Sequence, residues 1–224
     1  MKKVVFGVLT VLLLAVLATP FLLPEKTPDL DSAFKKFKEM DVKYNTDWKQ
    51  EELRNMLIGY TFIDDAINEL DAYQLEIAEN RDKLQDKTEL STWEELLTRL
   101  AEARKKMLES EKEYHHYQAL GPEGELEFEY VLGSPVVTEQ LNCNDMEALD
   151  KGQMFLQKSL NLAHEFENHM DFVLQNAPET RKSELVGINE AKPAFYSKEL
   201  GRISTQIKIN KWGVDVCKKK AMSR

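Results

Sequence analysis

The chain has 224 residues, a formal net charge of −9 at pH 7, and 31 % charged and 42 % hydrophobic residues. This composition is that of a folded protein, and the high charge with only nine glycines favours long solvated helices in one elongated domain. An acidic surface repels the phosphates of nucleic acids, so nucleic-acid binding is excluded.

Residues 4–23 contain no charged side chain and consist mostly of Val, Leu, Phe and Ala. About twenty apolar residues in a helix span the ~30 Å hydrocarbon core of a bilayer. Lys2 and Lys3 precede this segment, whereas Glu25 and Asp29 follow it. The positive-inside rule therefore predicts a single-pass membrane anchor, with the N-terminus in the cytoplasm and the rest of the chain outside.

A cleaved signal peptide is the alternative interpretation of the same segment. Val16 and Ala18 supply small residues at the −3 and −1 positions of a cut after Ala18. The apolar run continues to Leu23, beyond the usual length of a signal core, which favours a retained anchor. Cleavage would release a secreted or periplasmic protein, and both alternatives leave the domain on the same side of the membrane.

Three prolines separate the apolar segment from the rest of the chain: Pro20, Pro24 and Pro28. They prevent one continuous helix across the junction. A short amphipathic helix with Phe34 and Phe37 on one face is expected next. The predicted organisation is thus an anchor or signal over residues 1–24, a linker with this short helix over residues 25–46, and an extracytoplasmic helical domain over residues 47–224.

A heptad pattern after residue 47 is the clearest regularity in the sequence. Asp47, with Gln50 three residues later, is typical of a helix N-terminus. Apolar residues then recur at alternating spacings of three and four, which predicts the seam of a coiled coil or of an antiparallel bundle. The apolar seam residues are Leu53, Met56, Tyr60, Ile63, Ile67, Leu70, Ile77 and Leu84. Polar Gln74 and Arg81 interrupt the seam near its end, which favours a loosened helix end over a wet or partner-selecting seam.

A second helix is expected from Ser91 to Leu120. Ser91 and Glu94 fit a capping box, and Gly121-Pro122 is typical of a helix end. The connection to the preceding helix is short, so the two helices are expected to be antiparallel neighbours.

Residues 125–142 predict the one piece of β-structure. Glu125, Glu127 and Glu129 alternate with apolar residues, which is the period of a strand. A turn at Gly133-Ser134-Pro135 precedes the β-branched residues 136–138, so a small hairpin is expected to pack on the helices. The alternative is that Ser134-Pro135 opens a helix.

Two further long helical regions complete the pattern. The first begins after Asn144 and ends at Asn176-Ala177-Pro178. A helical stretch then leads to Pro193, which either kinks the chain or begins a new helix. The last apolar stripe is expected to close at Trp212-Gly213.

Cys143 and Cys217 are the two cysteines, and the domain is predicted to lie where thiols oxidise. If the last two long helical regions fold back on each other, the open ends of that helical hairpin bring the cysteines together. We therefore expect a disulfide, with free buried or partner-bridging thiols as the alternative.

The polar motifs predict neither a catalytic site nor a metal or cofactor site. His164 and His169 are five residues apart and diverge around a helix, unlike the histidines of zinc proteases. Glu113-x-x-His116 has di-iron spacing, but no second such pair exists in the chain. The carboxylates of residues 125, 127 and 129 are expected to form a solvated strand face rather than a cation site.

The sequence therefore predicts a mainly α protein, an N-terminal transmembrane helix followed by an elongated antiparallel bundle or coiled coil, with one small hairpin. The expected function is non-enzymatic: a membrane-anchored scaffold or interaction protein that binds itself or a membrane partner. The alternative is a sensor or carrier that binds a small ligand between its helices, with Gln74 and Arg81 pointing at an anionic ligand.

Overall fold

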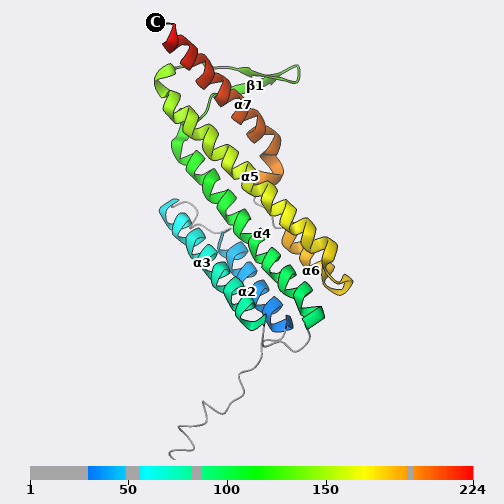
Figure 1. Cartoon of the computed structure of the whole chain (residues 1–224). Helices are drawn as coiled ribbons and strands as arrows, with labels where there is room; N and C mark the ends of the chain where they lie inside the picture. Colours follow the sequence, from blue (N-terminus) through cyan, green and yellow to red (C-terminus); the bar gives the residue numbers. More distant parts are fainter. Residues whose placement is uncertain (1–29, 49–55, 82–86, 191–193, 224) are drawn as a thin grey trace, which may run out of the picture.

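The computed structural model describes residues 30–48, 56–81, 87–190 and 194–223, which form an elongated helical bundle with one β-hairpin (Figure 1). The helices are α2 (Leu30–Trp48), α3 (Met56–Asn80), α4 (Lys87–Leu120), α5 (Met146–Asn176), α6 (Glu179–Glu190) and α7 (Ala194–Met222). Strands β1 (Phe128–Val131) and β2 (Ser134–Val137) pair in antiparallel fashion, and short 3-10 turns, η3 (Gly121–Gly124) and η4 (Cys143–Asp145), flank the hairpin. The predicted mainly α fold with one small hairpin is confirmed.

The membrane anchor predicted over residues 4–23 lies outside the described residues. Within the part of the chain that the structure describes, no helix combines the length and the apolar character needed to cross a membrane.

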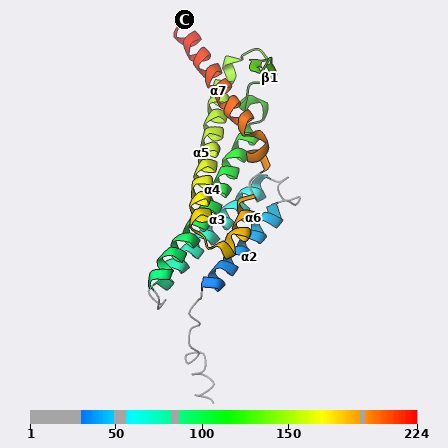
Figure 2. The ribbon, with the colours of Figure 1, turned by 90° about the vertical axis from the view of Figure 1, so that its right-hand side faces the viewer.

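Helices α4 and α5 run antiparallel through the centre of the molecule, and the other elements pack at either end of this pair (Figures 1 and 2). At one end, α2, α3 and α6 share a continuous apolar core with both central helices, to which α2 contributes Phe34 and Phe37. At the other end, α7 packs on α5 and supports the hairpin. Residues close in sequence therefore form α2–α3–α4, whereas the hairpin end combines segments from the middle and the end of the chain.

The described part of the heptad seam faces the chain's own helices. Ile63 and Leu70 are fully buried, and Ile67 and Ile77 pack against the same core. Met56 and Tyr60 lie in the first turns of α3, while Leu53 and Leu84 lie outside the described residues. The seam was expected to be covered either by this chain or by another copy, and over the described residues α2 and α4 cover it.

Three predicted helix boundaries are wrong. Asp47 does not cap α3 but lies within α2, because the packing of α2 on α3 and α4 overrides the local cap signal. Ser91 lies one turn inside α4, since the Lys, Glu and Leu residues before it are good helix formers. Trp212-Gly213 does not close α7, which continues to Met222 because Val214 and Cys217 bury their side chains beyond the glycine.

A buried ion pair joins α2 to α4. Arg104 of α4 and Asp41 of α2 contact each other through a guanidinium–carboxylate pair that is almost completely removed from solvent. One turn beyond Met107 on α4, Glu111 is also buried, and its Oε2 has no hydrogen-bond partner among the described residues. Burial raises the pKa of Glu111 to about 8, and the charge of Arg104 opposes this rise only in part.

The Glu111 carboxyl is expected to make the protein less stable as pH rises. In the unfolded chain a glutamate ionises near pH ~4.3, so between this pH and about 8 the folded protein holds a proton that the unfolded chain has released. The contribution of this carboxyl to stability therefore falls through this window and is constant on either side of it. Glu111→Gln stays neutral at every pH and should exceed the wild type by on the order of 2–4 kcal/mol at pH 8, but by nothing near pH 4.

Urea unfolding of both proteins across this pH range measures the effect. Equal pH dependence in wild type and Glu111→Gln would show that this carboxyl is not the buried acid responsible.

Gly152 of α5 lies against the backbone of Gly124. A Cβ atom added to Gly152 would lie 2.0 Å from the Gly124 carbonyl oxygen, so one of the two segments would have to move. Gly152→Ala is therefore expected to lower the free energy of unfolding by roughly 1–3 kcal/mol. The control is Gly187→Ala in α6, where nothing lies within 4 Å of the added atom, so better helix propensity should raise stability by about 0.5–1 kcal/mol. Thermal unfolding that shifts both variants in the same direction would contradict the close approach.

Candidate interaction site

Two buried amide side chains of α7 hold the chain that enters the hairpin. Asn210, which is fully buried, donates from Nδ2 to the Gly124 carbonyl (2.8 Å) and accepts at Oδ1 from the Leu126 amide (3.2 Å). Gln206 donates from Nε2 to the Leu126 carbonyl (3.0 Å) and to Asn210 Oδ1 (2.9 Å). These bonds satisfy backbone groups at the end of η3 and just before β1, outside the pairing of the two strands. The start of the hairpin is thereby fixed on α7.

This pair of amides is not among the residues predicted from the sequence. Gln206 and Asn210 are four residues apart and so lie on one face of α7, beside the buried residues Ile203 and Ile207. Two amides at that spacing next to an apolar stripe are a signal for a buried polar contact, but their partners are backbone groups that no sequence pattern identifies.

The inner face of the hairpin is apolar and packs on α5 and α7. Leu126 forms a small core with Leu149, Ile209 and Val214, and Phe128 and Val137 pack against it from the two strands. Nearer the turn, the Tyr130 hydroxyl contacts Thr205 Oγ1 of α7 at 2.9 Å. The hairpin, which would be marginal alone, is therefore supported by a core at its base and by one hydrogen bond nearer the turn.

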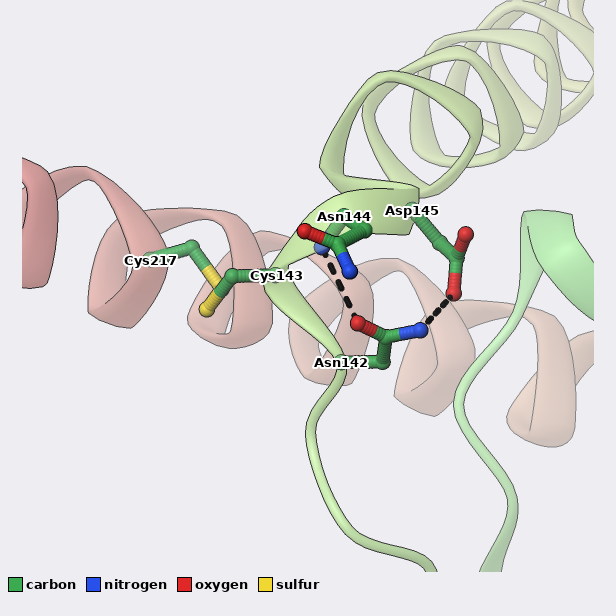
Figure 3. The surroundings of a disulfide bond; sticks show 5 residues. All are labelled: Asn142, Cys143, Asn144, Asp145 and Cys217. Carbon is green, nitrogen blue, oxygen red and sulfur yellow. Dashed lines mark hydrogen bonds between the residues drawn. A yellow bond between two sulfur atoms is a disulfide. The ribbon is translucent and has the colours of Figure 1, made fainter.

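The disulfide between Cys143 and Cys217 closes the same end of the molecule (Figure 3). The Cα atoms of the two residues are 5.4 Å apart, and the bond links η4 to α7. Asn142 orders the turn beside it, accepting at Oδ1 from the amide of Asn144 (3.1 Å) and donating from Nδ2 to Asp145 (2.7 Å). The predicted disulfide is confirmed, although Cys217 lies inside α7 rather than beyond its end.

The hairpin turn consists of Leu132 and Gly133, and both have positive φ angles, +51° and +82°. Ser134 pairs with Val131, so Ser134 and Pro135 belong to β2 and not to the turn as the sequence predicted. This geometry corresponds to a type I′ turn, which favours Asn-Gly because both central residues are left-handed. For leucine the left-handed conformation costs roughly 1–2 kcal/mol. Leu132 is thus a poor residue for the turn that it forms.

Three aliphatic side chains at this end of the hairpin are exposed to solvent. Leu132 is 102 % exposed, and Val131 and Val136 are each 45 % exposed. Pairing of Val131 with Ser134 and of Glu129 with Val136 places both valines on the outer face, opposite the core. We refer to Val131, Leu132 and Val136 as the hairpin tip.

Carboxylates share the outer face with the hairpin tip. Glu127 and Glu129 alternate with the inward residues Leu126 and Phe128 and are exposed, as the strand pattern predicted. They do not meet Glu125 in one cluster: Glu125 is partly buried and accepts a hydrogen bond from the Tyr117 hydroxyl. Among the described residues no group of three His, Cys, Asp or Glu side chains is arranged to hold a metal ion.

The polar seam residues lie at the opposite end of the molecule. Gln74 donates from Nε2 to the Thr98 carbonyl and to Glu102, both at 3.2 Å, so its amide is bonded inside the bundle. Arg81 is 66 % exposed and pairs with Glu94 at 3.2 Å, at the edge of an open groove of about 560 Å³. The Gln74 side chain therefore links α3 to α4, whereas Arg81 lies at the surface.

Removal of the disulfide is expected to lower the free energy of unfolding by about 4 kcal/mol on the chain-entropy model. Cys143 and Cys217 are 74 residues apart, and closing so long a loop restricts the unfolded chain strongly. Urea unfolding of the Cys143→Ser/Cys217→Ser double variant measures the loss. Reductant should lower the midpoint of the wild type and leave the variant unchanged; a wild-type midpoint insensitive to reductant would contradict the prediction.

Comparison with known proteins identifies no relative. No protein-family model matches the chain, and no curated protein or solved structure shows significant similarity to it. The geometry of the hairpin end is therefore the basis for a functional proposal.

Proposed function

We propose that this protein is a membrane-tethered, extracytoplasmic interaction protein of scaffold type, without enzymatic activity, that presents its hairpin end to a protein partner. The observation that carries the proposal is the hairpin tip: three exposed apolar side chains on a hairpin whose opposite face is held by a core, buried amides and a disulfide. Exposed apolar groups on a rigid support are typical of binding surfaces.

The location in this proposal rests on two features of the chain. The uncharged segment of residues 4–23 follows Lys2 and Lys3, a pattern typical of a single-pass anchor that leaves the following domain outside. The Cys143–Cys217 disulfide is compatible with that side of the membrane, because disulfides persist in oxidising compartments and are rare in the cytosol.

The shape of the molecule supports a partner at a distance from the membrane. Helix α2 begins at Leu30 at one end of the bundle, while the hairpin and the C-terminal end of α7 lie at the other (Figures 1 and 2). Helix α4 connects the two ends, and its 34 residues correspond to about 50 Å. A chain tethered ahead of Leu30 would thus hold the hairpin tip away from the bilayer.

The partner surface proposed differs from the one that the heptad pattern suggested. Ile63 and Leu70 of the seam are buried against other helices of the same chain and are not available to a second molecule. Self-association or binding of a membrane protein therefore requires another surface, and in the part of the chain that the structure describes the hairpin tip gathers three exposed apolar side chains on a fixed support.

A ligand-binding sensor or carrier is the second candidate. A cleft of about 350 Å³, within the size range of ligand pockets, lies where α4, α5 and α7 meet. Leu156 and Ile203 form part of its wall, and Arg202, which makes no ion pair among the described residues, lies at the same cleft. The cleft is open to solvent and is lined by both polar and apolar residues, which makes this the weaker candidate.

Cross-linking of lysines in the host's own membranes tests the leading proposal. The full-length protein is cross-linked in place and purified, and the proteins attached to it are identified by mass spectrometry. One stoichiometric protein partner is expected. Its cross-links should fall on exposed lysines of the hairpin end, Lys208 and Lys211 of α7, and not on Lys35 of α2. This distribution follows from the position of the hairpin tip.

The absence of any reproducible protein partner would reject the scaffold function and favour a small molecule in the cleft of α4, α5 and α7. A partner that cross-links only to Lys35 would retain an interaction function but move its site to the other end of the molecule.

A further inference from the structure

We propose that the hairpin tip inserts its leucine into an apolar pocket of the partner protein and that the rim of this pocket is basic. This inference rests on the proposed interaction function and names the chemistry of its partner. The recognition element is Leu132 with Val131 and Val136 beside it, and the carboxylates of Glu127 and Glu129 on the same face select the rim.

The exposure and backbone conformation of Leu132 indicate that its side chain contacts another molecule. It is fully exposed and its φ angle is +51°, a conformation that asparagine or glycine adopts more readily. The fold therefore gains nothing from a leucine here, in packing or in turn formation. A large apolar group at the end of a narrow hairpin has the shape to enter a pocket rather than to cover a flat surface.

The charge around the hairpin tip points to a basic partner. From Gly121 to Asp150 the chain contains eight Asp and Glu residues and no Lys, Arg or His. Glu127 and Glu129 form no ion pair among the described residues, and neither do Lys208 and Lys211 of α7. Apolar side chains with carboxylates beside them complement an apolar pocket that has Lys and Arg at its rim, whereas an anionic lipid surface would repel the carboxylates.

The edge of β2 disfavours recognition by strand addition. In the observed register Tyr130 and Pro135 form a pair whose backbone groups point away from the other strand. A residue with an N–H at position 135 would therefore offer a hydrogen-bond donor on the outer edge of β2. Because proline has no N–H, the edge of β2 lacks a hydrogen-bond donor that an added strand would need. At the edge of β2, insertion of a side chain is thus favoured over extension of the sheet.

A photo-reactive phenylalanine analogue placed at position 132 tests the contact directly. The full-length chain that carries the analogue is produced in its host's membranes. Control chains carry the analogue in place of Leu75 of α3 or Val186 of α6, which are also exposed apolar residues. The expected result is one cross-linked protein from position 132 and none from the two control positions.

Side-chain substitutions then test the two parts of the recognition element. Leu132→Asn suits the turn, so it should leave the unfolding temperature unchanged or higher while recovery of the partner by lysine cross-linking falls at least tenfold. Glu127→Arg/Glu129→Arg, which adds no lysine, should lower recovery at least tenfold as well. Glu39→Arg/Glu179→Arg changes the net charge equally at exposed sites of α2 and α6 and should leave recovery unchanged.

Each outcome decides for or against the inference. The inference is supported if the analogue at position 132 cross-links one protein, and if lysine cross-linking of that protein is lost in both hairpin variants but kept in the charge control. Cross-linking of position 132 to lipid or to a second copy of this chain would overturn it, as would binding of the purified protein to phosphatidylserine vesicles that Leu132→Asn abolishes. A partner that cross-links only from Leu75 or Val186 would overturn the inference and keep the interaction function, whereas no partner from any position would reject both.

Discussion

Two buried serines exchange hydrogen bonds where the two longest helices cross, and the rest of the molecule is arranged around this contact. Ser110 of α4 donates to the Ser159 carbonyl (2.8 Å), and Ser159 of α5 donates to the Ser110 carbonyl (2.9 Å). Because the two side chains are small and satisfy each other's polar groups, the helices approach closely without an unpaired hydroxyl. The central pair thus presents two ends, and each end gathers its own set of elements.

The α2 end depends on charge as well as on apolar packing. Arg104 is almost fully buried on α4, where it contacts Asp41 of α2 and donates from Nη1 to Met107 Sδ at 2.8 Å. A buried ion pair adds little net stability, because desolvation of both charges offsets their attraction. Its effect is on position: α2 docks where its carboxylate meets the guanidinium, since any other docking would leave one charge buried alone.

At the hairpin end, the inner and outer faces of the hairpin differ in how well they obey the rules of a stable fold. Its inner face satisfies the rules of a stable fold, with an apolar core, bonded backbone groups and a covalent cross-link. Its outer face breaks those rules at Leu132, a bulky residue in a left-handed turn and fully exposed. Local departures from folding rules that the surroundings support are characteristic of functional sites, and this contrast within one hairpin is why the proposal centres on it.

The sequence by itself predicted the helical class, a small hairpin within residues 125–142 and a disulfide between Cys143 and Cys217, because these expectations follow from periodicity, alternation and helix lengths along the chain. It also placed Ile63 and Leu70 on one face of a helix. Only the tertiary structure decided that this face is covered by α2 and α4 of the same chain, that α7 extends past Gly213, and that Asn210 holds the base of the hairpin. These depend on which segments meet in space, and local patterns carry no information about a partner that lies far away in the chain.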